Sequence, residues 1–335
     1  MFQFLQRNSR FNAILFFLMI VMLWGGNLLN PHFAPRYYDT VPMMLYKPLV
    51  LIQNWSVLAG QLITLLFVGV NAILLAKANN DVRLIEKRSA FHILLYIILS
   101  ASMQEFRQLN PMQPALTFII LALMWLFRIY KQEHDLKTIF ECGVLFSIAS
   151  LFYAPAILFA ALLFVGLIVL TSFNLRQWIS GIVGLCLPYI IVVSLAFCFN
   201  SLENVREVIR YNLFMTHQEP FNELIPILFS CYLALLFILS VAYAFAGNLK
   251  KVSIRKYYLI LIFFLAIVLV SYLTMSCLDY SFLFFGLLPI TIYVTNYMIN
   301  IRRKFWAEVL FLIILVFAVL VQVLAGVPMP TLDIL

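Results

Sequence analysis

The sequence predicts an all-α fold, a polytopic transmembrane helical bundle of about eleven spans. Of its 335 residues, 64% are hydrophobic and only 11% are charged, and the mean hydropathy is +1.02. Apolar runs recur from one end of the chain to the other, and short basic clusters separate them. No soluble domain could bury that much apolar surface, so the composition excludes soluble classes of protein.

The expected spans follow from the length that a helix needs to cross a bilayer, about 20 residues, or fewer when a span is tilted or broken. They lie near 12–29, 56–77, 90–103, 113–129, 138–153, 156–171, 179–199, 224–246, 257–276, 281–300 and 306–326. Only two residues separate the fifth range from the sixth, at the break Tyr153-Ala154-Pro155. We interpret these three residues as a turn on the outer side, with Pro155 starting the next helix.

The basic residues predict the orientation, N-terminus inside and C-terminus outside, because cytoplasmic loops are enriched in Lys and Arg. Of the 22 basic residues, seventeen fall on the N-terminal side of the membrane and five on the other side. The seventeen are Arg7, Arg10, Lys77, Arg83, Lys87, Arg88, Arg128, Lys131, Lys137, Arg176, Lys250, Lys251, Arg255, Lys256, Arg302, Arg303 and Lys304; the five are Arg36, Lys47, Arg107, Arg206 and Arg210. Such clusters are typical of topology determinants, so we expect no nucleic-acid partner.

Two long loops are expected on the outer side, residues 30–55 and 200–223. The run Val41–Trp55 suits a helix that lies in the membrane interface and is broken at Pro48. In the second loop apolar residues recur at helical spacing, opposite charged ones. No repeat or linker is evident, so the sequence predicts a single integral membrane domain, 1–335.

The stretch 103–111 places an acid and a base between two apolar runs, where unsatisfied polar groups would be costly. Glu105 is a candidate catalytic base, and Arg107 is a candidate phosphate-binding residue. The alternative is a local ion pair in a loop, with Asn110-Pro111 starting the next helix.

Asp39, in Pro35-Arg36-Tyr37-Tyr38-Asp39-Thr40, is the second catalytic candidate. A carboxylate in the first outer loop could act as a general base toward a hydroxyl acceptor. The alternative is an interfacial acid that pairs with Arg36 and serves only the structure.

Arg206 and Arg210 are spaced to grip a pyrophosphate together, and we treat them as candidate substrate-binding residues. Glu203 and Glu207 stand where helical salt bridges would neutralise both arginines, and this alternative is favoured. His217 is a lone loop histidine of the kind that is usually solvated. No metal-ligand spacing is present, so the sequence predicts neither a metal nor another cofactor.

Several motifs resemble an uncharacterised polytopic inner-membrane protein family of Bacteroidota. They are Gly143-Val144-Leu145-Phe146-Ser147-Ile148-Ala149-Ser150-Leu151-Phe152-Tyr153-Ala154-Pro155, with Leu109-Asn110-Pro111 upstream and Arg176-Gln177-Trp178-Ile179, Gly184 and Pro188 downstream. The resemblance covers most of the chain. It implies a multi-pass protein of a Gram-negative cell inner membrane and brings no established activity.

More distantly, the layout is similar to the membrane module of GT-C glycosyltransferases. Those enzymes have an acid in the first outer loop followed by an interfacial helix, places that Asp39 and Val41–Trp55 occupy here. The superfamily usually shows a close acidic pair, whereas Asp39 stands between Tyr38 and Thr40. The resemblance implies transfer of a sugar from a polyprenyl-phosphate-linked donor on the outer face.

Two functions are therefore open. The first is a GT-C-like transferase of cell-envelope biogenesis, with membrane lipids and a polyprenyl-phosphate-linked donor as partners. The second is a non-catalytic membrane subunit of an envelope assembly or export complex, whose partners would be other inner-membrane proteins. A lipid-width groove opening beside Glu105 would favour the first, and an apolar helix flank exposed beside an empty cavity would favour the second.

Overall fold

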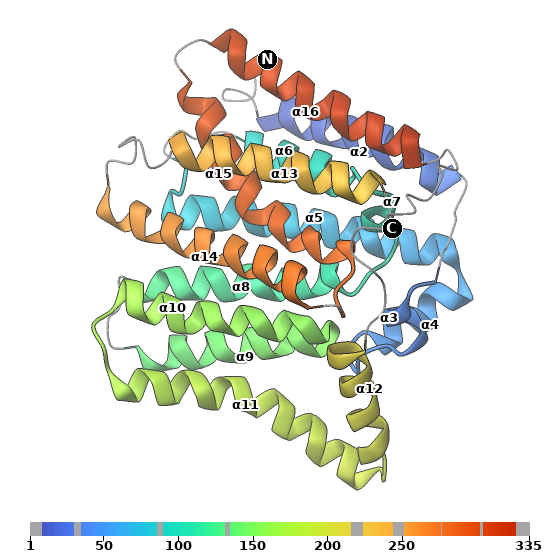
Figure 1. Cartoon of the computed structure of the whole chain (residues 1–335), viewed down its shortest axis with the longest axis vertical. Helices are drawn as coiled ribbons and strands as arrows, with labels where there is room; N and C mark the ends of the chain where they lie inside the picture. Colours follow the sequence, from blue (N-terminus) through green and yellow to red (C-terminus); the bar gives the residue numbers. More distant parts are fainter. Residues whose placement is uncertain are drawn as a thin grey trace.

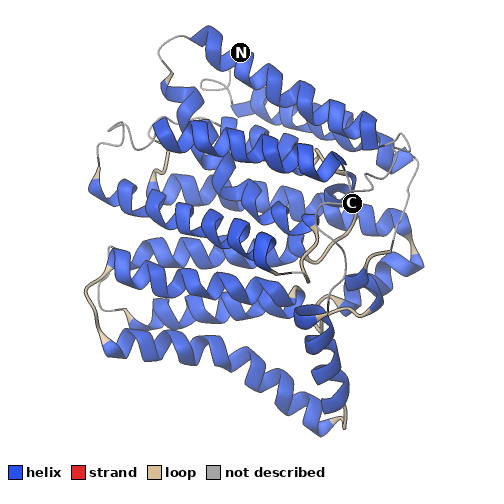
Figure 2. Cartoon of the chain, in the orientation of Figure 1, coloured by secondary structure: helices blue, strands red, loops and turns tan. Residues whose placement is uncertain are grey.

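The protein is described here by a computed structural model, and every regular element in its described part is a helix, without a strand (Figure 2). The described residues are 9–29, 35–85, 90–130, 135–215, 224–243, 251–275, 277–301 and 304–325. The helices are α2 (Ser9–Leu29), α3 (Tyr37–Thr40), α4 (Lys47–Trp55), α5 (Val57–Val82), α6 (Phe91–Ser100), α7 (Gln104–Arg107), α8 (Met112–Ile129), α9 (Leu136–Phe152), η1 (Ala154–Ala160), α10 (Ala161–Leu170), α11 (Leu175–Cys198), α12 (Leu202–Phe214), α13 (Leu224–Tyr243), α14 (Val252–Thr274), η3 (Tyr280–Gly286), α15 (Leu287–Asn300) and α16 (Lys304–Ala325).

A helix occupies each of the expected apolar ranges, so the all-helical fold is confirmed, and its apolar helices suggest a membrane protein. Within the described residues, 6 helices are long and apolar enough to cross a membrane: Val57–Val82, Met112–Ile129, Leu175–Cys198, Val252–Thr274, Tyr280–Asn300 and Phe305–Val323. Shorter apolar helices are Phe16–Leu29, Phe91–Ser100, Ala154–Leu170 and Leu228–Ile238. The count of eleven spans, their orientation and the single domain 1–335 stay predictions.

The long helices run back and forth between two ends of one bundle (Figure 1). At one end lie α3, α4, α7, α12 and the start of η3, which we call the cluster end. At the opposite end α5 and α8 finish, and α9, α11 and α14 begin. Segments that are far apart in the sequence are therefore neighbours at the cluster end.

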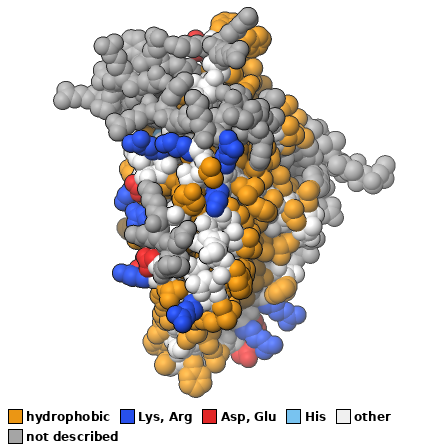
Figure 3. Space-filling view, turned by 90° about the vertical axis from the view of Figure 1, so that its left-hand side faces the viewer, with side chains coloured by type: hydrophobic (Ala, Val, Ile, Leu, Met, Phe, Trp, Pro, Cys, Tyr) orange, Lys and Arg blue, Asp and Glu red, His pale blue; other side chains and the backbone are white. Residues whose placement is uncertain are grey.

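Lys and Arg side chains gather at the end opposite the cluster end (Figure 3), which we call the basic end. The described basic residues on the helix termini that meet there are Lys77, Arg83, Arg128, Lys137, Arg176, Lys251, Arg255 and Lys256. All of them belong to the set that the sequence assigns to the cytoplasmic side. The structure keeps these described residues together, and the side of the membrane that they face stays a prediction.

The break at Tyr153 lies where the sequence places it. Helix α9 ends at Phe152, Tyr153 is extended with φ −139° and ψ 107°, and η1 begins at Ala154 with Pro155 in its first turn. Proline is tolerated there because the first turn of a helix has no acceptor for its missing N–H. Tyr153 and Ala154 are buried, and the Tyr153 ring packs against Phe282 and Phe285 of η3.

Proline plays the same part between α3 and α5, where the expectation of a helix broken at Pro48 is wrong. Helix α4 begins at Lys47, so Pro48 lies in its first turn and starts the helix. Val50 and Gln53 are buried, whereas Leu51 and Trp55 are exposed, as befits a helix with one side on the protein.

Glycines allow α9 and α11 to pack at close range. A Cβ atom added to Gly184 would lie 2.3 Å from the Phe140 carbonyl oxygen, and one added to Gly143 would lie 2.6 Å from the Gly181 carbonyl oxygen. No side chain fits between the backbones at this crossing. Past Pro188 α11 diverges from the bundle, and α12 returns to it (Figure 1).

Candidate functional site

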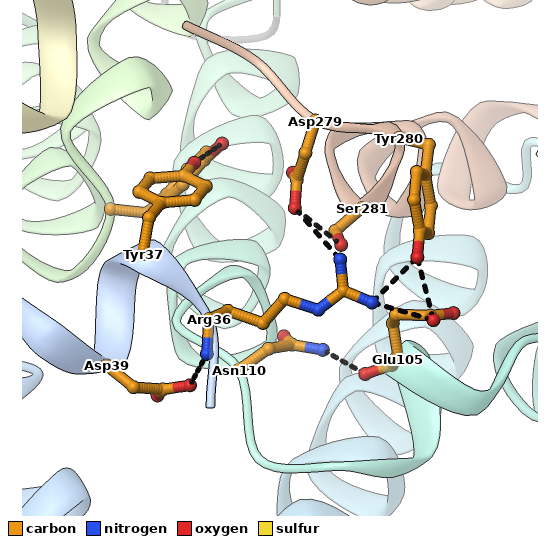
Figure 4. Close-up of polar contacts among 9 residues, drawn as sticks. Arg36, Tyr37, Asp39, Glu105, Asn110, Asp279, Tyr280 and Ser281 are labelled. Atoms are coloured by element: carbon orange, nitrogen blue, oxygen red, sulfur yellow. Dashed lines mark hydrogen bonds and ion pairs between the residues drawn. The ribbon is translucent and has the colours of Figure 1, made fainter. Parts of the chain in front are cut away.

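Arg36 is the centre of a polar cluster at the cluster end (Figure 4). Its Nη2 donates to Glu105 Oε1 at 2.8 Å and to the Tyr280 hydroxyl at 2.7 Å. The Tyr280 hydroxyl in turn donates to Glu105 Oε1 at 2.8 Å, which closes a triangle of three side chains. On the other side of the guanidinium, Nη1 lies 4.0 Å from Asp279 Oδ2. We call Arg36, Asp39, Glu105, Asp279 and Tyr280 the arginine cluster.

The sequence fixes Glu105 through the turn that follows it. Asn110 Nδ2 donates to the Glu105 carbonyl oxygen at 3.0 Å, and Asn110 Oδ1 accepts the backbone N–H of Gln113 at 3.1 Å. Gln113 Nε2 returns a hydrogen bond to the Phe106 carbonyl oxygen at 2.8 Å. Asn110 thus satisfies a free N–H in the first turn of α8, and the two amide groups satisfy carbonyl oxygens of α7, which ties α7 to the start of α8.

Asp39 lies beside Arg36 but points away from its guanidinium (Figure 4). Its Oδ2 accepts the backbone N–H of Arg36 at 2.9 Å, and its Oδ1 accepts the hydroxyl of buried Tyr46 at 3.1 Å. Burial raises the pKa of Asp39 to about 6, against the effect of these two hydrogen bonds. The carboxyl group is thus ionised at neutral pH and can still take up a proton near it, as a general base must.

Asp279 is buried, with 1% of its surface exposed. Its Oδ2 accepts the Ser281 hydroxyl at 3.1 Å, whereas Oδ1 has no hydrogen-bond partner among the described residues. Burial raises the pKa of Asp279 to about 6, and the charge of Arg36 opposes that rise. A buried carboxylate oxygen without a partner is costly and typical of a functional site.

Arg107 is buried next to the cluster, and the ion pair that the structure shows for Glu105 is with Arg36. Arg107 Nε has no hydrogen-bond partner in the described part of the chain. Burial lowers the pKa of Arg107, and the charge of Glu105 opposes this shift. A guanidinium stays protonated all the same, so Arg107 is a buried cation with a donor to spare.

Two tyrosine hydroxyls lie on the far side of Asp279. The hydroxyls of Tyr37 and Tyr153 are 3.2 Å apart, and both interact electrostatically with Asp279. They join α3 to the break that follows α9.

Arg206 and Arg210 lie on the exposed face of α12. Arg206 Nη1 is 3.9 Å from Glu203 Oε2, the helical salt bridge that the alternative interpretation predicts. Asn212 Nδ2 donates to the Val41 carbonyl oxygen at 2.9 Å, which holds α12 beside α3. A role for either arginine in binding substrate stays a prediction, and His217 lies outside the described residues.

Sequence reasoning selected Asp39, Glu105 and Arg107 but missed the residues that organise them. Arg36 was considered only as a partner of Asp39, and Asp279 and Tyr280 were given no role. The available signal was position, since Asp279-Tyr280 precedes a predicted span on the same side as Asp39 and Glu105. In the described ranges no group of three or more His, Cys, Asp or Glu is placed to hold a metal ion.

Comparison with known proteins adds a family without an activity. Residues 40–327 match the model of a family of unknown function, DUF6427. No curated protein and no solved structure matches the chain. The arginine cluster must therefore supply the functional argument.

Proposed function

The chain belongs to DUF6427, a family of unknown function, and we propose that it is a multi-pass inner-membrane transferase of cell-envelope biogenesis. In this proposal the cluster end faces the outer side of the membrane, and the donor is a polyprenyl-phosphate-linked sugar. The observation that carries the proposal is the meeting of carboxylates and guanidinium groups from three separate loops at one end of the bundle.

The roles follow from how each group is held. Asp39 is the general base, because its raised pKa of about 6 lies near the pH at which it would work. Arg107 binds the donor phosphate, because it is a buried cation with an unpartnered donor. Glu105 is held by Arg36 and Tyr280, so it acts on the reaction mainly by fixing Arg36 and by its charge on Arg107.

The alternative is a non-catalytic subunit of an envelope assembly or export complex, and one observation favours it. After Pro188 the apolar side chains of α11 are exposed on most sides, including Ile190, Ile191, Leu195 and Phe197. Such a helix is covered either by lipid or by the helices of a partner protein.

Complementation of a deletion strain separates the two functions. Asp39→Asn and Glu105→Gln keep the shape of each side chain and remove its charge, and Glu203→Gln on exposed α12 is the matched control. A transferase predicts altered envelope glycans for Asp39→Asn and for the double variant at normal protein level. Wild-type glycans in both variants would contradict the transferase function and leave the non-catalytic subunit as the remaining function.

A further inference from the structure

A groove lies between α13 and α14, and η3 and α15 form its floor. Its volume is about 210 Å³, and its walls are almost entirely apolar. Lining side chains include Leu233 and Phe237 on α13, Leu269 and Leu273 on α14, and Leu283 and Ile290 on the floor. Water has no hydrogen-bond partners on such walls, so an apolar occupant is favoured.

The mouth of the groove opens on a surface that is itself apolar. Leu269 and Leu273 line the groove and are still 37% and 66% exposed. Beside it on α13, Leu235 and Ile238 are exposed too. In a bilayer this surface faces hydrocarbon, so a lipid chain can enter the groove sideways without crossing a polar barrier.

The groove and the arginine cluster share helix η3, which carries Leu283 of the groove and Tyr280 of the cluster. Leu283 lines the groove and follows Asp279 and Tyr280 closely in the chain, on η3. Tyr272 lines the groove as well, and the Tyr272 hydroxyl interacts electrostatically with Asp279. Packing continues on the other side, where the Phe106 ring of α7 lies 5.1 Å from the ring of Phe284.

We infer that the groove binds one hydrocarbon chain of a membrane lipid whose polar head lies at the arginine cluster. The apolar lining selects the chain, and the buried guanidinium of Arg107, whose Nε has no hydrogen-bond partner among the described residues, selects an anionic head. The inference rests on the proposed function for the identity of that head as the phosphate of the donor lipid. Annular lipid, which merely surrounds the protein, would not need the groove.

The test uses the full protein in nanodiscs with a polyprenyl phosphate that carries a diazirine on its chain. After photolysis, mass spectrometry measures the label on α14 residues 265–273. Ala234→Phe fills the groove, and Leu235→Phe adds the same ring next to it on the exposed side of α13. The labelling of Ala234→Phe should fall by about tenfold or more, the effect of losing two buried methylene contacts, and that of Leu235→Phe should not.

Equal labelling of both variants would overturn the inference and assign the lipid to the annulus. Gly286→Val is the second variant, because it enters the groove from the floor, where an added Cβ would meet Leu265 at an ordinary 3.6 Å. A diazirine phosphatidylcholine serves as the comparison lipid. If it labels the groove as strongly as the polyprenyl phosphate does in all variants, the inference is also overturned. Groove labelling that persists in an Asp39→Asn protein with full transfer activity would refute the proposed function and keep the groove.

Discussion

Arg36 Nη2 donates to Glu105 Oε1 at 2.8 Å, across 69 residues of sequence. Each side chain is 17% exposed, so the pair is only partly screened by solvent. It joins the segment before α3 to α7, and Tyr280 fastens both to η3. One guanidinium thus connects three segments that leave the bundle separately.

Removing this guanidinium should cost far more stability than removing an exposed one. Arg36→Gln leaves Glu105 and Asp279 without their cation, and breaking a buried ion pair costs about 3 kcal/mol or more. Arg128→Gln is the matched control, because Arg128 lies 3.5 Å from Asp81 with both side chains more than a third exposed. That exposed pair is worth about 1 kcal/mol at most. Thermal unfolding in detergent should separate the variants, and equal losses would show that Arg36 is not a structural centre.

The free energy of unfolding should depend on pH through the protonation of Asp279. Burial raises its pKa to about 6, so the folded protein binds this proton more tightly than the unfolded chain does. The carboxyl group therefore costs stability above pH 6, and the cost disappears as the pH falls through 6 toward the ordinary value of about 4.

Relative to Asp279→Asn, the wild-type protein should gain about 3 °C in Tm between pH 7.5 and pH 4.5, the equivalent of roughly 2 kcal/mol for a chain of this length. Glu203→Gln, which removes an exposed carboxylate of α12, controls for the general effect of charge. A Tm difference between wild type and Asp279→Asn that does not change with pH would exclude a raised pKa.

The crossing of α9 and α11 should not accept a methyl group. An added Cβ at Gly184 would lie 2.3 Å from the Phe140 carbonyl oxygen, so Gly184→Ala must push the helices apart. Overpacking of this kind costs about 1–3 kcal/mol. Gly69→Ala is the control, since nothing lies within 4 Å of its added Cβ. If both variants unfold at the wild-type temperature, the helices do not pack this closely.

The predicted topology has the basic end in the cytoplasm and the cluster end outside. Reporter fusions after Lys251 should be active on the cytoplasmic side, and fusions after Asn212 on the periplasmic side. The physical reason is the retention of Lys and Arg in cytoplasmic loops. Reversed activity at either position would contradict the orientation, whereas the helical fold would be unaffected.

The apolar helices were predictable from the sequence because each is a local apolar run, and six of those in the described part also meet the length rule for a membrane span. The arginine cluster was predictable only in part. Asp39 and Glu105 stood out because an acid beside an apolar run is unusual, but their connection depends on tertiary packing. Arg36 and Tyr280 are 244 residues apart, and no spacing rule within a helix or loop relates them. Pro48 was expected at a break within a helix, whereas it lies in the first turn of α4. Composition alone does not locate the first turn of a helix.

The most direct test measures transfer itself, in inner-membrane vesicles that contain equal amounts of each protein. The donor is the polyprenyl-phosphate-sugar fraction extracted from the same cells, labelled in the sugar, and the rate is the loss of label from lipid. Asp39→Asn should lower this rate by about 100-fold or more, the scale of lost general-base help, while Glu203→Gln keeps it. An unchanged rate in correctly folded Asp39→Asn would contradict the assignment of the arginine cluster as a transferase site.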